Sequence, residues 1–212
     1  MTGDSKGWLN VRYSDDNTTY PPLPNYLRVE YHGTHDGRDS LTVLEGKPAG
    51  RSATVRHRDD GSSYLEDGAP WLPPGEVVYA RKSGMLWYGI DGPIAVTTDN
   101  SNPQPYGRFD LEIPDEVHPG AAAYEAQSIY AKTWFRVGHS GDRYLHTGSL
   151  SAGCTTVTDV GSWTGIYQYL IRRRKGDKKS VGSITVVRYS WERWIPQAIS
   201  DAVGQLLKLP GY

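Results

Sequence analysis

Short runs of alternating apolar and polar residues recur along most of this chain, and Gly or Pro separates them. Alternation with a period of two puts every second side chain on one face of a strand. Gly and Pro between such runs supply the turns. Strands are predicted at residues 26–31, 41–44, 53–58, 77–80, 86–89 and 94–97. The pattern predicts a mainly β fold, a sandwich or a barrel.

Length and charge limit the classes of function. The 212 residues suffice for one large domain or two small ones with a real core. A net charge of −1 gives no overall field that would favour nucleic acid, so we expect no nucleic-acid partner. No apolar run approaches the roughly 18 residues that a membrane span needs. Residues 1–6 also lack the apolar core of a secretory signal.

The pattern divides the chain into three parts. Residues 1–25 are predicted to be an extended N-terminal segment, residues 26–188 the main β domain, and residues 189–212 a helical tail. The tail carries apolar residues on one helical stripe, and the stripe either packs on the domain or contacts a partner. Residues 115–130, rich in alanine, form either a lid or a surface excursion.

One further helix is predicted after the single cysteine. Its apolar residues fall at helical spacing on one face: Trp163, Ile166, Tyr167, Leu170 and Ile171. Ser162 is the expected N-cap and Gly176 the expected end. The basic run 172–175 suits the dipole at a helix C-terminus, which explains it without a nucleic-acid partner.

The strongest chemical signal is the stretch 144–157, which holds the only cysteine. If residues 149–151 form the loop of a β-hairpin, His146 pairs with Cys154. Side chains directly opposite one another have Cβ atoms roughly 4.5–5.5 Å apart, so a thiol and an imidazole can meet. Backbone N–H groups of Ala152, Gly153 and Cys154 could then hold an oxyanion. The alternative is that Cys154 is a small buried apolar residue.

Other histidines are candidates for the base or for a metal site. His139, in a Gly-rich loop, is the competing base, but we prefer His146 because it lies opposite Cys154 in the expected hairpin. His32, His35 and Asp36 offer metal-ligand types within five residues, yet no third His or Cys lies nearby at zinc spacing. We therefore predict no metal site and no cofactor.

The order His146-Thr147-Gly148, then Ser151-Ala152-Gly153-Cys154, resembles the motif of the L,D-transpeptidase catalytic domain family. Residues 72–79 resemble that family's Pro-x-Gly strand entry, and residues 106–111 resemble the segment before its catalytic strands. The resemblance extends over residues 40–188. In that family an Arg or Asn often stands two residues after the cysteine, where this chain has Thr156.

The resemblance implies an enzyme whose cysteine attacks a peptidoglycan stem peptide, with His146 as base and Thr147 orienting the imidazole. Arg136 and Arg143 would bind substrate carboxylates, with Ser151 and Trp134 lining the site. The outcome depends on the acceptor: an amine gives cross-linking or exchange, and water gives carboxypeptidase activity.

The missing signal and the variant motif resemble the interbacterial toxin branch of the family. We accordingly expect synthesis in the cytoplasm, action in the periplasm or cell wall, including that of a target bacterium, and an immunity protein or secretion-machinery component as partner. Two alternatives stay open. One is a non-catalytic β module of a secretion apparatus or a wall-binding protein, and the other is an unrelated cysteine hydrolase that uses His139.

Overall fold

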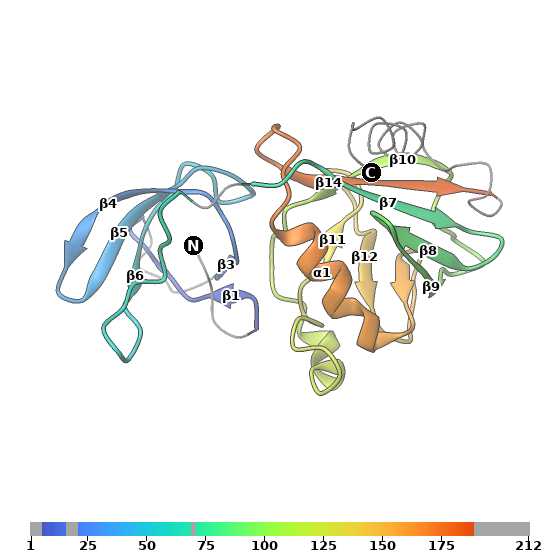
Figure 1. The fold of residues 1–212 in the computed structure, drawn as a ribbon, viewed down its shortest axis with the longest axis horizontal. Coiled ribbons are helices and arrows are strands. Elements are labelled where there is room, and N and C mark those ends of the chain that lie inside the picture. Colours follow the sequence, from blue (N-terminus) through green and yellow to red (C-terminus); the bar gives the residue numbers. More distant parts are fainter. Residues whose placement is uncertain (1–5, 16–20, 69–70, 189–212) are drawn as a thin grey trace, which may run out of the picture.

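The computed structural model describes residues 6–15, 21–68 and 71–188. The described chain is mainly β, as predicted. Strands from residues 8–56 form two small sheets, and strands from residues 75–187 form one large sheet (Figure 1). The predicted tail at residues 189–212 lies outside the described residues. Within those described residues, no helix has the length and apolar character to cross a membrane.

The first part is built on a four-stranded antiparallel sheet. Its order is β2 (Arg12–Tyr13), β6 (Ser52–Arg56), β5 (Arg38–Val43) and β4 (Val29–His35). Along β5, buried and partly buried residues alternate, which is the burial pattern expected of a strand with one face on a core. A separate pair joins β1 (Trp8–Leu9) to β3 (Leu23–Pro24). Three predicted strands, at 26–31, 41–44 and 53–58, thus correspond to β4, β5 and β6 with shifted ends.

The residues His32, His35 and Asp36, which offer metal-ligand side chains, belong to the β4–β5 hairpin. His32 lies in β4 and its Nε2 is 2.8 Å from the Thr42 hydroxyl on β5. Asp36 and Gly37 form the turn with positive φ angles of 50° and 67°. An Asp-Gly pair tolerates these angles, which suits a tight hairpin.

The second part is an eight-stranded sheet that is nearly closed into a barrel. Its order is β10 (Gly107–Glu112), β14 (Ser180–Val187), β7 (Gly75–Ala80), β8 (Met85–Tyr88), β9 (Asp91–Thr97), β13 (Thr155–Val157), β12 (Tyr144–Thr147) and β11 (Phe135–Arg136). The β14–β7 and β12–β13 pairs are parallel, and the others are antiparallel. A bridge between Leu111 and Val137 brings the two edge strands together.

The predicted helix is confirmed as α1 (Trp163–Ile171), and its five predicted apolar residues are its buried ones. Its start matches the prediction, since Ser162 is the N-cap residue, but its end and the role of the Ser162 hydroxyl differ. The helix stops at Ile171 instead of Gly176, and the hydroxyl of Ser162 donates to Asp159 at 2.6 Å and caps no helix N–H. Two short 3-10 helices, η1 (Pro119–Tyr124) and η2 (Val160–Ser162), complete the elements.

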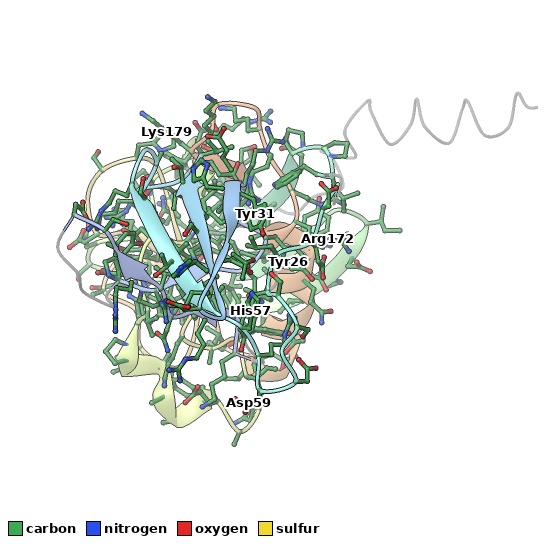
Figure 2. The ribbon with its side chains drawn as sticks, turned by 90° about the vertical axis from the view of Figure 1, so that its left-hand side faces the viewer. Tyr26, Tyr31, His57, Asp59, Arg172 and Lys179 are labelled. Carbon is green, nitrogen blue, oxygen red and sulfur yellow. The ribbon has the colours of Figure 1, made fainter. Side chains whose placement is uncertain are left out.

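The basic run lies at the C-terminus of α1, as predicted, where Arg173 donates to the Tyr169 carbonyl at 2.9 Å and Arg174 to the Ile171 carbonyl at 3.0 Å, and it also connects the two parts. The guanidinium of Arg174 lies 2.8 Å from Glu45 and also donates to the Tyr26 carbonyl at 2.8 Å. Figure 2 shows Arg172 beside Tyr26, and its guanidinium carbon lies 5.2 Å from the centre of that ring. The sheets therefore divide the chain between residues 56 and 75, whereas the sequence predicted a boundary after residue 25.

Candidate active site around Cys154 and His146

The strand that carries His146 and the strand that follows Cys154 are parallel, so the predicted hairpin was wrong. β12 pairs with β13 in parallel register, with Leu145 opposite Thr155 and His146 opposite Thr156. The pair extends over only three positions. Residues 148–154 can therefore return the chain to the start of β12 without the long crossover that parallel strands usually need.

This register separates the sulfur from the imidazole along the strands. Extending it by one residue sets Cys154 beside Tyr144, two positions from His146. Two positions correspond to roughly 6–7 Å, because a strand rises about 3.3 Å per residue. The Sγ atom of Cys154 accepts the Tyr144 N–H at 3.4 Å and lies 3.7 Å from the Asp142 carbonyl. Within the described chain, neither His146 nor His139 hydrogen-bonds to this sulfur.

His146 is held as a neutral ring. Its Nδ1 lies 2.9 Å from the Thr147 carbonyl oxygen, which only accepts, so Nδ1 carries the hydrogen. Its Nε2 is then the acceptor, and the Thr156 hydroxyl lies 3.0 Å away. Trp134 stacks on the imidazole with ring centres 4.2 Å apart. Burial lowers the pKa of His146 to about 4, which leaves the imidazole uncharged at neutral pH.

The thiol is also uncharged in this arrangement. Cys154 is 7% exposed, and burial raises the pKa of its thiol, with the Asp142 carboxylate adding to the effect. The Tyr144 N–H opposes this by favouring a thiolate. Cys154 and His146 are therefore both neutral, in contrast to a preformed thiolate–imidazolium pair.

The turn before the cysteine is fixed by its own contacts. The Ser151 hydroxyl donates to the Cys154 carbonyl at 2.9 Å. Arg143 donates to the Gly153 carbonyl at 2.5 Å and to the Asn102 side chain at 2.6 Å. Arg143 and Ser151 thus hold the turn in place. Throughout the described ranges, the backbone N–H groups of Ala152 and Gly153 donate no hydrogen bond, as an oxyanion site requires.

Arg136, the other expected carboxylate ligand, is bound by the carboxylates of the protein itself. Its guanidinium lies 3.0 Å from Glu112 and contacts Asp115 and the Gly141 carbonyl. Trp134, in contrast, lies where a site residue is expected, since it covers one face of the His146 ring.

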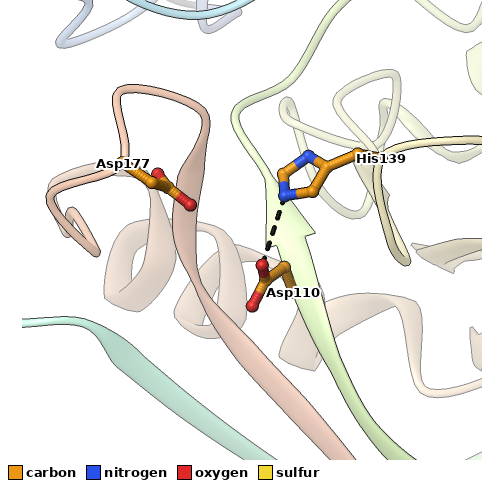
Figure 3. A group of neighbouring side chains, drawn as sticks. All are labelled: Asp110, His139 and Asp177. Atoms are coloured by element: carbon orange, nitrogen blue, oxygen red, sulfur yellow. Dashed lines mark hydrogen bonds and ion pairs between the residues drawn. The ribbon is translucent and has the colours of Figure 1, made fainter.

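His139 belongs to a different cluster. Its Nε2 lies 3.2 Å from Asp110 and 3.3 Å from the Ser180 hydroxyl, and its Nδ1 lies 3.5 Å from Glu112. Figure 3 shows the ring directed toward Asp110, with Asp177 on a separate loop on the left of the view. These contacts place His139 at the β10–β14 edge of the sheet, whereas Cys154 is next to β12.

Two residues of this region were not predicted from the sequence. Thr156 is the hydrogen-bond partner of the His146 base nitrogen, a role hidden by the wrong strand direction. His118 also stacks on Trp134, with ring centres 4.0 Å apart, so Trp134 contacts two histidines. A signal for His118 was present, because Asp115, Glu116 and His118 bring three potential metal ligands within four residues.

The Tyr124 side chain joins the predicted lid segment to the loop after His146. Its hydroxyl accepts the Ser149 N–H at 3.0 Å and lies 2.7 Å from the Ser149 hydroxyl. The segment 115–130 therefore borders the candidate site.

Comparison of the chain with protein-family models, with curated proteins and with solved structures gave no match.

Proposed function

We propose that the chain is a cysteine acyltransferase that acts on peptidoglycan stem peptides, as an L,D-transpeptidase or L,D-carboxypeptidase or by D-amino-acid exchange. The observation that carries the proposal is the pairing of strands around Cys154 and His146. A neutral imidazole, oriented by the Thr147 carbonyl, lies on the strand next to the one that the cysteine precedes. The motif from His146 to Cys154 supports the same chemistry.

Catalysis requires the thiol and the imidazole to leave their present partners. The Thr156 hydroxyl has a second acceptor, the Leu150 carbonyl at 3.3 Å, so it can turn away and free Nε2 of His146. Rotation of the Cys154 side chain away from Tyr144 then brings Sγ toward this nitrogen. Nε2 takes the thiol proton, and the thiolate attacks the carbonyl carbon of the stem-peptide bond.

The backbone N–H groups of Ala152 and Gly153 donate hydrogen bonds to the carbonyl oxygen and stabilise the negative charge that forms on it. When the bond to the terminal D-amino acid breaks, the imidazolium returns its proton to the leaving amine. The acyl group stays on Cys154 as a thioester. An incoming amine then gives a cross-link or an exchanged peptide, and water gives a shortened one.

The site of action follows from the substrate. Stem peptides lie in the periplasm or cell wall, so the protein would act there, including in the wall of a target bacterium. A toxin of this kind requires an immunity protein in the producing cell.

A second candidate function has an observation in its favour. Cys154 is buried and both nitrogens of His146 are already hydrogen-bonded, which is also the arrangement of an inert structural pair. The chain would then be a non-catalytic β module of a secretion apparatus or a wall-binding protein.

The test is to incubate the full-length protein with muropeptides that carry tetrapeptide stems and to follow release of D-alanine or its exchange for another D-amino acid. We expect turnover by the wild type and a loss of at least about 1,000-fold in Cys154→Ala, because the nucleophile is removed. Equal turnover in the variant would refute the acyltransferase. Wall binding by both proteins without turnover would favour the β module.

A further inference from the structure

Three side chains of the types that bind metal ions lie together between β10 and η1. Asp115, Glu116 and His118 each have a ligand atom within 4.8 Å of the other two. The backbone of this segment is fixed, because the His118 N–H donates to the Lys132 carbonyl at 3.0 Å and Val117 forms a β-bridge with Thr133. We propose that these three side chains bind one divalent transition-metal ion, with Zn²⁺ as the best fit.

Two buried atoms in this group have no hydrogen-bond partner. They are Oδ1 of Asp115 and Nε2 of His118. The Asp115 side chain is 2% exposed, so water does not satisfy it from the surface. Leaving such a group unpaired destabilises the folded chain. Both atoms can offer a lone pair, and a cation between them would satisfy both.

Glu116 supplies the third ligand and is uncommitted. No ion pair joins its carboxylate to any Lys, Arg or His in residues 6–15, 21–68 and 71–188. It is half-buried and lies next to Asp115 in the chain, so its carboxylate can turn toward the other two ligand atoms without breaking a contact.

The surrounding charges leave one oxygen of Asp115 available. Arg136 binds its Oδ2, and Lys47 lies 3.4 Å from the same oxygen. Arg136 also pairs with Glu112 at 3.0 Å, so three carboxylates face two cations here. Burial lowers the pKa of His118 to about 4, which keeps its imidazole in the neutral form that binds metals.

The donor set selects the kind of ion. An imidazole with carboxylates suits Zn²⁺ and related first-row metals, whereas Mg²⁺ and Ca²⁺ prefer oxygen ligands alone. Zinc bonds of about 2.0–2.2 Å place tetrahedral ligands roughly 3.3–3.6 Å apart. The three ligand atoms would close from their present spacing onto the ion, and water would take the fourth position.

A matched control exists in the same molecule. Asp110, His139 and Asp177 also lie within 4.8 Å of one another (Figure 3). Their atoms are already engaged, because Lys175 lies 2.6 Å from Asp110 and the Ser180 N–H donates to Asp177 at 2.7 Å. This cluster has the ligand types without the unpaired atoms, so we expect it to bind no metal.

The experiment uses metal-stripped, tag-free full-length protein. Co²⁺ is added while visible absorption is recorded, and Zn²⁺ binding is measured by calorimetry. We expect one ion per chain, with the intense d–d bands of a tetrahedral Co²⁺ site. Glu116→Gln and His118→Gln should each weaken binding at least tenfold, and His139→Gln should leave it unchanged.

Several results would overturn the site. These are no uptake at millimolar metal, uptake that survives both substitutions, or an equal loss in His139→Gln. Glu116→Gln is the decisive variant because the side chain makes no ion pair that folding requires, and its circular dichroism should match the wild type. The site does not depend on the proposed acyl transfer, since binding is read without any substrate.

Discussion

His146 and His139 both precede Cys154 in the chain, yet the fold gives them opposite surroundings. His146 is buried between the Trp134 ring and the Thr156 hydroxyl, and no carboxylate of the described residues contacts it. His139 is exposed and contacts the carboxylates of Asp110 and Glu112. An imidazole in an aromatic, uncharged pocket stays neutral and can accept a proton. An imidazole between carboxylates can form ion pairs when it is protonated.

Their relation to the sulfur differs as well. His146 lies on the strand that pairs with the one after Cys154. His139 follows Gly138, whose N–H donates to the Asp110 carbonyl, and so it lies at the seam between β10 and the end of β11. Their positions in the sheet therefore distinguish His146 from His139 as the candidate base, which the sequence alone does not do clearly.

The largest expected difference between the two histidines is in turnover. His146→Ala should lower kcat for muropeptide turnover by about 100- to 10,000-fold, the range for loss of a general base. His139→Ala should stay within about twofold of the wild type. Initial rates of D-alanine release measure both. A larger loss in His139→Ala would reverse the assignment and favour the unrelated hydrolase.

The second contrast is in the pH dependence of stability. The pKa of His146 is about 4 in the folded chain and 6.5 in the unfolded one. Between these values the unfolded chain binds more protons, so stability is full above pH 6.5 and falls as the pH drops toward 4. The shift corresponds to roughly 3 kcal/mol.

Urea unfolding between pH 7 and pH 4 tests this. His146→Leu should flatten the fall in unfolding free energy relative to the wild type. A part of the fall remains in His146→Leu, because burial also lowers the pKa of His118 to about 4. An unchanged slope in His146→Leu would mean that His146 is not the buried neutral group described above.

The smallest contrast concerns two glycines, one in each region. Gly153 has a φ of +97°, and an added Cβ would lie 2.8 Å from the Asn102 carbonyl and from Arg143. Gly141, in the His139 loop, has a φ of +80° and no atom within 4 Å of that position. Gly153→Ala should cost roughly 2–4 kcal/mol, from backbone strain and crowding together. Gly141→Ala should cost about 1 kcal/mol, from strain alone.

Thermal unfolding of the two variants measures the difference. Equal shifts in melting temperature would show that the turn before Cys154 is not tightly clamped by Arg143 and Asn102. The larger shift expected for Gly153→Ala should be accompanied by a loss of turnover, since the same turn carries the N–H groups of the oxyanion site.

The sequence determined those features that depend on neighbouring residues. Alternation with a period of two predicted the mainly β fold and three of the strands in the four-stranded sheet, β4, β5 and β6, because strand burial follows the pleat. Apolar spacing predicted the buried face of α1, from Trp163 to Ile171, because a helix turns every 3.6 residues. The C-terminal end of α1 was missed because it depends on contacts made elsewhere: the basic run after the helix reaches Glu45 and Tyr26.

Only the tertiary structure decided how the candidate site is assembled. Parallel and antiparallel strands show the same alternation of side chains, so the pattern around His146 could not reveal the direction of its neighbour. That direction replaced Cys154 by Thr156 as the residue opposite the imidazole. It is set by the ladder in which β13 pairs with β12 on one side and, on the other, with β9, which comes from a distant part of the chain. Long-range pairing of this kind also placed Arg136 among carboxylates and left one oxygen of Asp115 without a partner.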